Sequence, residues 1–143
     1  MVFTGHLWKE SKLWVISVPS LEITTQGRSK GEALRMIRDA IEGHVDKKGF
    51  RVHVSAPLKM EGAVESFTVS AKTDSDLVAL FLRRQRQLND LTVREVAKRL
   101  GYASPSAYAQ YETGRHVPGL DKISKFLRAM NPHTQCALEV VMC

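Results

Sequence analysis

The sequence contains little cysteine, no long apolar run and no repetitive segment, and each absence excludes a class of protein. Its two cysteines, Cys136 and Cys143, lie in the last eight of 143 residues. Two thiols at one end cannot cross-link a fold of this size, so a reducing cytoplasm is expected. No apolar run approaches the roughly 18 residues that a membrane span requires, and the opening MVFTGHLWKE lacks the apolar core of a secretory signal. Without repeats or low-complexity tracts, a fibrous or solenoid protein is not expected.

Positive charge is in excess. The chain has 21 Lys+Arg against 15 Asp+Glu, which gives a formal net charge of +6. It is 43% hydrophobic and 25% charged, close to the usual composition of globular proteins, so an ordered core is expected. The positive excess favours an anionic partner such as nucleic acid, although charge alone does not identify the partner.

The first half of the chain has the pattern of a small α+β unit. Ser29 precedes Glu32 by three residues, which is the spacing of a capping box, and the helix that follows has apolar residues at the helical period. β-branched, aromatic and alternating apolar residues predict strands at Leu7–Trp8, Leu13–Val18, Ile23–Thr25 and Phe50–Ser55. We therefore predict an N-terminal domain over residues 1–56, with one helix lying on a sheet.

The second half is predicted to be helical. Residues 57–75 contain Pro57 and Gly62 and are interpreted as a linker, in which Ser66–Lys72 is either a further strand or an extended chain. Residues 76–143 are predicted as an all-α domain with a C-terminal strand at Ala137–Met142. Its four expected helices are Leu77–Leu88, a helix that begins after Thr92, Pro105–Glu112 with Ser104 as its cap, and a helix with apolar residues at the helical period from Leu120 to Met130.

The strongest motif is TVREVAKRLGYASPSAYAQYETGRHVPGLDKI, residues 92–123. Thr92 and Glu95 form a capping box, Gly101 allows a tight turn, and the small Ala97 lets two helices approach closely. With the run LT…VAKRLG…YETG…P…L, residues 76–131 resemble the helix-turn-helix of the phage-repressor (Cro, xenobiotic-response-element) family. The resemblance implies that Pro105–Glu112 is the recognition helix, which lies in the major groove of DNA. The structural alternative is a helical bundle unrelated to DNA.

The same resemblance implies which residues contact DNA. The positions that would face base edges are Ser104, Pro105, Ser106, Ala109 and Gln110, and Gln110 is suited to adenine. Thr92, Arg94 and Arg115 complete the predicted DNA-binding set. The stretch from residue 77 to residue 99 carries six basic residues against two acids, namely Arg83, Arg84, Arg86, Arg94, Lys98 and Arg99 against Asp90 and Glu95. The turn at residues 101–104 is one residue longer than the family pattern.

A second resemblance lies in VPSLEITTQGRSKGEALRMIRDAIEGHV, residues 18–45. This segment is similar to the HicB antitoxin signature, in which Val-Pro ends a strand and Thr-Gln-Gly leads to a capped helix with Glu-Ala-Leu. The loop here is one residue shorter than that signature and lacks its Pro-Gly. A HicB-like unit followed by a repressor-type helix-turn-helix is the order found in antitoxins of that family. The resemblance implies a partial RNase H-like sheet that binds a small ribonuclease toxin of the HicA type.

Patterns typical of catalysis or metal binding are missing from the sequence. The five histidines do not have metal-ligand spacing, and there is no Gly-x-Ser-x-Gly elbow or phosphate-cradling glycine loop. The acidic residues before residue 66 do not predict the inward carboxylate pair that a two-metal nuclease needs. We therefore expect no enzymatic activity, no metal and no cofactor.

These patterns together predict a cytoplasmic antitoxin that covers a HicA-like toxin and represses its own operon by binding double-stranded operator DNA. Repressors of this type read two half-sites, so a homodimer or a higher even oligomer is expected. Two alternatives stay open. One is a stand-alone Cro-like regulator whose N-terminal unit senses a small molecule or dimerises, and the other is an RNase H-like nuclease.

Overall fold

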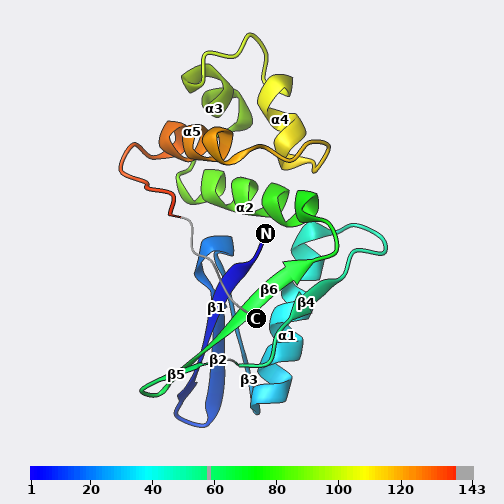
Figure 1. Cartoon of the computed structure of the whole chain (residues 1–143), viewed down its shortest axis with the longest axis vertical. Coiled ribbons are helices and arrows are strands. Elements are labelled where there is room, and N and C mark those ends of the chain that lie inside the picture. The colour runs from blue at the N-terminus through cyan, green and yellow to red at the C-terminus, as the bar shows by residue number, and fades with distance from the viewer. Residues whose placement is uncertain (58, 138–143) are drawn as a thin grey trace.

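The computed structural model describes residues 1–57 and 59–137, which form a curled antiparallel sheet and five α-helices (Figure 1). The first part contains β1 (Phe3–Glu10), β2 (Leu13–Val18), the short 3-10 helix η1 (Pro19–Leu21), β3 (Ile23–Gly27), α1 (Lys30–Val45), β4 (Val52–Val54), β5 (Lys59–Glu61) and β6 (Val64–Ala71). The second part contains α2 (Asp74–Leu88), α3 (Val93–Arg99), α4 (Ser106–Glu112) and α5 (Leu120–Met130). The predicted α+β class is confirmed.

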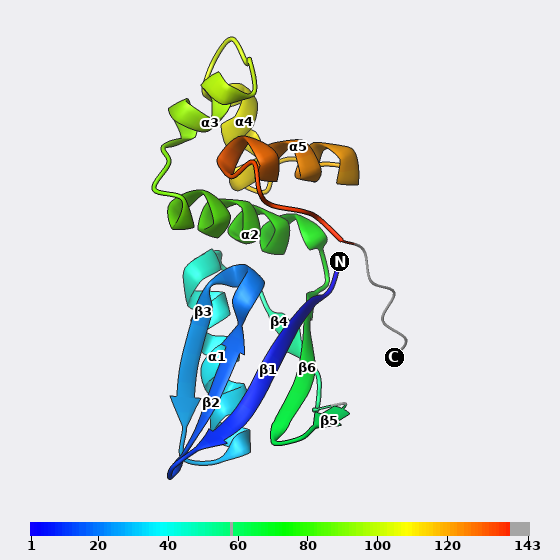
Figure 2. The same cartoon turned by 90° about the vertical axis from the view of Figure 1, so that its left-hand side faces the viewer.

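The sheet has the strand order β3-β2-β1-β6-β4, with β5 also paired to β6, and every pair is antiparallel. Side chains alternate between its two faces, so Phe3 and Leu7 of β1 are buried whereas His6 and Trp8 point to the opposite side and are only half-buried. Helix α1 covers the first of these faces (Figure 2). The second face of the sheet carries no such cover from α1.

A glycine on the central strand β1 makes room for an aromatic ring. Gly5 lies opposite Phe67 of β6, and a Cβ atom placed on Gly5 would be 2.1 Å from Cζ of Phe67. The Phe67 side chain is fully buried in the core that the sheet forms with α1. The close packing of this core therefore depends on the absence of a side chain at residue 5.

Residues 57–75, which the sequence predicts as a linker, contain the strands β5 and β6 in the structure. Of the two options for Ser66–Lys72, the strand is present, and β6 pairs with β1, β4 and β5. Gly62 does mark a turn, with φ +63° between β5 and β6, but turn residues do not reveal that the chain returns to the middle of the sheet. The sheet thus extends to Ala71, and the division of the chain into domains at residues 1–56 and 76–143 stays a prediction.

Helix α2 belongs to two hydrophobic cores. Leu77 and Leu80 are buried in the core of the sheet and α1, whereas Val78 and Leu82 are buried among α3, α4 and α5. Phe81 is partly buried and packs against both cores. A helix that buries two faces in this way connects the sheet to the C-terminal helices by side-chain packing as well as by the chain itself.

The caps of α1 and α3 follow the sequence, with one difference. At α3 the capping box is confirmed: the Glu95 amide donates to Thr92 Oγ1 (3.1 Å) and the Thr92 amide donates to Glu95 Oε2 (2.7 Å). At α1 the Glu32 amide donates to Ser29 Oγ (3.1 Å), but the Glu32 carboxylate accepts from the Arg28 amide instead of the Ser29 amide. The α1 cap is therefore only half of the predicted reciprocal pair.

Two further expectations concern helix length and the end of the chain. Within the described part of the chain, no helix combines the length and the hydropathy needed to cross a bilayer. Most of the predicted strand Ala137–Met142 falls outside the described residues, which end at Ala137. Ala137 itself is exposed and does not belong to a strand.

Candidate nucleic-acid interface

Helices α3 and α4 form the end of the molecule farthest from the sheet, and a glycine turn joins them (Figure 1). Gly101 has φ +75°, a conformation that favours glycine. Its amide donates to the Lys98 carbonyl (3.0 Å), and the Tyr102 amide donates to the Ala97 carbonyl (2.9 Å). These two bonds are the pair that defines a Schellman motif, so α3 ends sharply and the chain is redirected into α4.

Two tyrosines hold α4 against the hydrophobic core of the C-terminal helices. Tyr108 is fully buried and Tyr111 is 8% exposed. Both rings contact Phe126 of α5, with centroid separations of 5.2 and 5.0 Å. The small Ala97 of α3 is buried in the same core, as the sequence predicts. Aromatic contacts of this kind fix the orientation of α4 and leave its other side for contacts outside the domain.

A buried ion pair joins α4 to α2. Arg86 donates from Nε to Oε1 of Glu112 (2.8 Å) and from Nη2 to Oε2 (3.0 Å), and its Nη1 donates to the Leu91 carbonyl (2.7 Å). The two side chains are only 15% and 7% exposed. The hydrogen bonds to Glu112 raise the pKa of the Arg86 guanidinium. Burial, together with the nearby Glu112 carboxylate, raises the pKa of Tyr108.

The predicted base-reading residues lie at the start and on the body of α4. Ser104 and Ser106 are exposed, and their Oγ atoms are 2.8 Å apart. The predicted cap by Ser104 is therefore wrong: α4 begins at Ser106, one residue later than expected, and Pro105 precedes it with helical dihedral angles and no side-chain cap bond. The cap bond is missing because the two serine hydroxyls form a hydrogen bond with each other instead of accepting one from a helix amide.

The remaining two reading positions are half-buried. Ala109 offers only a methyl group, as expected from its side chain. The side-chain amide of Gln110 donates from Nε2 to the Ala107 carbonyl (3.0 Å). A base contact by Gln110 would exchange this internal hydrogen bond for one to adenine, so the net gain is smaller than for a free amide. Contact of these residues with DNA stays a prediction.

The predicted phosphate contacts lie at the two ends of the α3–α4 pair. Arg94 is the second residue of α3, and Arg115 follows the end of α4, where its amide donates to the Gln110 carbonyl (3.2 Å). Both side chains are exposed and have no hydrogen-bond partner within residues 1–57 and 59–137. Thr92 is exposed too, and its hydroxyl accepts the cap bond while keeping its own hydrogen to donate.

Most of the basic residues between positions 77 and 99 act inside the fold, which sequence composition does not reveal. Arg84 donates to the carbonyls of Leu21 (3.1 Å) and Glu22 (2.6 Å), and Arg83 donates to the His44 carbonyl. Arg99 donates to the Ala129 carbonyl (3.0 Å), and Arg86 pairs with Glu112 as described. The six basic residues therefore do not form one phosphate-binding surface. Arg94 and Lys98 remain without such a bond in the described part of the chain.

The match to known families agrees with this geometry. A family model described as a helix-turn-helix domain matches residues 77–131. Residues 77–131 are a helix-turn-helix DNA-binding domain. In this helix-turn-helix domain α3 and α4 are the two helices of the motif, and α4 has the position of the recognition helix. No curated protein matches the chain, and the similarity of residues 18–45 to HicB antitoxins rests on the sequence pattern alone.

Proposed function

We propose that the protein is a non-enzymatic repressor that binds double-stranded DNA through α4. The observation that supports this function is the placement of α4 at the end of the molecule, anchored from behind by Tyr108 and by the Arg86–Glu112 pair. An α-helix fits the major groove. The exposed cations Arg94 and Arg115, at either end of the motif, suit phosphates on the groove edges. Two half-sites require two such helices, so the proposed active form is a homodimer or a higher even oligomer.

The more specific proposal is that the protein is a cytoplasmic HicB-type antitoxin, which neutralises a HicA-like mRNA-cleaving toxin and represses the shared operon. The similarity of residues 18–45 to the HicB signature supports it. The sheet also offers a broad surface on the side opposite α1 (Figure 2). On that side Trp8 lies in register between Val15 and Val64, and Val64 is 37% exposed. A partly apolar surface of this kind is suited to a protein partner.

DNA binding is tested by selecting duplexes from a random library with the full-length protein and measuring affinities for the selected site. Arg94→Ala should weaken binding to all sequences similarly and reduce the slope of log K against log salt by about one for each bound protomer. Gln110→Ala should instead relax the preference at one base pair, by about 1 kcal/mol or more. If both variants keep the affinity and the sequence preference of the wild type, α4 does not lie in the groove.

The antitoxin role is tested by co-expression with the product of the neighbouring gene and a pull-down. A small bound ribonuclease that loses its activity supports the proposal. Ser66→Arg, in the middle of the open sheet face, should prevent capture, whereas Asp39→Arg on the exposed side of α1 should not. If the neighbouring product does not bind, the stand-alone regulator is the better interpretation. Metal-dependent RNA cleavage by the purified chain would instead establish the nuclease.

A further inference from the structure

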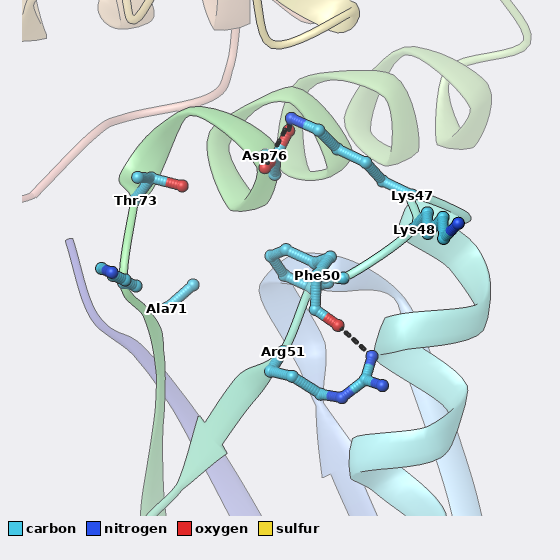
Figure 3. A pocket seen from close by; sticks show the side chains of 9 residues that line it. Lys47, Lys48, Phe50, Arg51, Ala71, Thr73 and Asp76 are labelled. Carbon is cyan, nitrogen blue, oxygen red and sulfur yellow. Dashed lines mark hydrogen bonds and ion pairs between the residues drawn. The ribbon is translucent and has the colours of Figure 1, made fainter.

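Four basic side chains surround a hollow beside the helix-turn-helix domain. The hollow has a volume of about 180 Å³ and lies between the loop that joins α1 to β4 and the turn that joins β6 to α2 (Figure 3). The loop contributes Lys47, Lys48 and Arg51, and the turn contributes Lys72 and the Thr73 hydroxyl. The cations come from segments far apart in the sequence, so they gather here only in the folded chain.

The acidic side chain that lines this hollow is already paired. Asp76 is the one acid that lines it, and its buried carboxylate accepts two hydrogen bonds from Lys47 Nζ (3.0 and 3.1 Å). Asp74 pairs with the N-terminal amine. Arg51 donates to the Phe50 carbonyl (2.6 Å) and lies 3.8 Å from the Glu42 carboxylate. This leaves Lys48 and Lys72 as exposed ammonium groups with no ion-pair partner in the described ranges.

The hollow adjoins the turn that follows α4. Asp76 Oδ1 would be 2.9 Å from a Cβ atom on Gly114, the residue before Arg115. A second hollow of about 280 Å³ is lined by Lys47 and Asp76 together with Glu112 and Thr113 at the end of α4. The α1–β4 loop and the α4–α5 turn therefore lie side by side, and both project on the same side of the molecule (Figure 1).

We propose that Lys48 and Lys72 form a second phosphate-binding surface, which contacts the DNA backbone flanking the sequence that α4 reads. The inference rests on the proposed DNA binding by α4. Arg115 positions the nearest phosphates at the end of α4, and Lys48 and Lys72 extend the positive surface from there. Both lysine side chains are exposed, which suits a polyanion that passes along the surface. Each phosphate neutralised by a lysine releases condensed counterions from the duplex.

The fold holds this surface in a fixed position relative to α4. Lys47 bonds to Asp76 of α2, and Arg84 of α2 bonds to the carbonyls of residues 21 and 22. The shared packing of α2 in both cores adds to these bonds. The N-terminal unit therefore does not have to become ordered when the second surface binds DNA. Such ordering would reduce the affinity gained.

The test compares the double variant Lys48→Ala/Lys72→Ala with Lys9→Ala/Lys12→Ala in the full-length protein. The control removes the same charge from exposed residues at the β1–β2 turn, at the opposite end of the sheet (Figure 1). Fluorescence anisotropy measures the salt dependence of binding to two duplexes. The short duplex covers only the selected site, and the long one extends it by about 10 base pairs, one helical turn, on each side.

On the long duplex, Lys48→Ala/Lys72→Ala should reduce the slope of log K against log salt by nearly two for each bound protomer, at about 0.9 for each lost phosphate contact. On the short duplex it should match the wild type, and the control variant should match the wild type on both. Equal slopes for the two variants on the long duplex overturn the inference and leave the binding by α4 intact. An equal loss on both duplexes also overturns it, because the lysines would then lie within the site that α4 reads. If the wild type binds no duplex, the proposed function and the inference both fail.

Discussion

Glu112→Gln should destabilise the helix-turn-helix domain more than any change at its DNA-facing residues. Arg86 and Glu112 are only 15% and 7% exposed, and two short hydrogen bonds join them. Glutamine keeps the shape of the side chain, but its amide group places a donor against the guanidinium, and the Arg86 charge loses its counter-ion. Removal of one partner from a buried ion pair costs about 3–5 kcal/mol. Because Arg86 keeps its bond to the Leu91 carbonyl, we expect a loss near the lower figure, about 3 kcal/mol.

Urea and thermal unfolding of the full chain, followed by circular dichroism, measure this loss. A chain of this length loses about 3 °C in Tm per kcal/mol, so Tm should fall by roughly 10 °C. Arg115→Ala, at an exposed position, is the control and should change stability by less than about 0.5 kcal/mol. The double variant Arg86→Met/Glu112→Leu should recover most of the loss, because an apolar pair leaves no buried charge without a partner.

A loss of less than about 1 kcal/mol for Glu112→Gln would refute this reasoning. That value is typical of ion pairs in contact with solvent. It would mean that water reaches Arg86 in the folded protein and replaces the carboxylate. The same result would remove the Arg86–Glu112 pair as the support that fixes α4 on α2.

Two further predictions concern the N-terminal unit. Gly5→Ala should lower the free energy of unfolding, measured in urea, by about 1–3 kcal/mol because its Cβ would meet the Phe67 ring. Gly43→Ala in α1, where a Cβ meets nothing within 4 Å, should leave this free energy unchanged or raise it. Equal effects of the two substitutions would contradict the packing argument. Burial and the neighbouring Arg84 and Arg83 lower the pKa of His44 below 6.5, so the unfolded chain takes up a proton more readily, and stability should decrease as the pH falls below about 6.5. His44→Gln should lose less stability than the wild type between about pH 7 and pH 5, and parallel curves for the two proteins would rule out this contribution of His44.

The helix-turn-helix domain was predictable because its determinants are local. Thr92 and Glu95 of the capping box are three positions apart, and the hydrogen bond that closes the Gly101 turn joins residues five positions apart. The apolar period that buries Tyr108 and Tyr111 is visible within one helix. Signals of this length can be interpreted from the sequence without knowing what the segment packs against.

The remaining features depend on partners distant in the chain. Arg86 bonds to a residue 26 positions away, and Lys47 bonds to one 29 positions away. An arginine that satisfies a buried carboxylate or a carbonyl has the same sequence signature as one that faces phosphate, so the basic stretch between residues 77 and 99 was ambiguous. Strand β6 was ambiguous for a related reason, because only the pairing with β1 distinguishes a central strand from an extended connector.

Helix α2 also limits how the helix-turn-helix domain can be transferred to another protein. A chimera that joins a foreign sensor to the chain at residue 73 would expose Leu77 and Leu80 to water, because the surface they rest on would be gone. The transferable DNA-reading module must therefore carry new surface residues on that side of the helix. For the same reason, a ligand bound to the sheet cannot act on α4 through a flexible linker. It must act through a tilt of α2, which moves α4 as well.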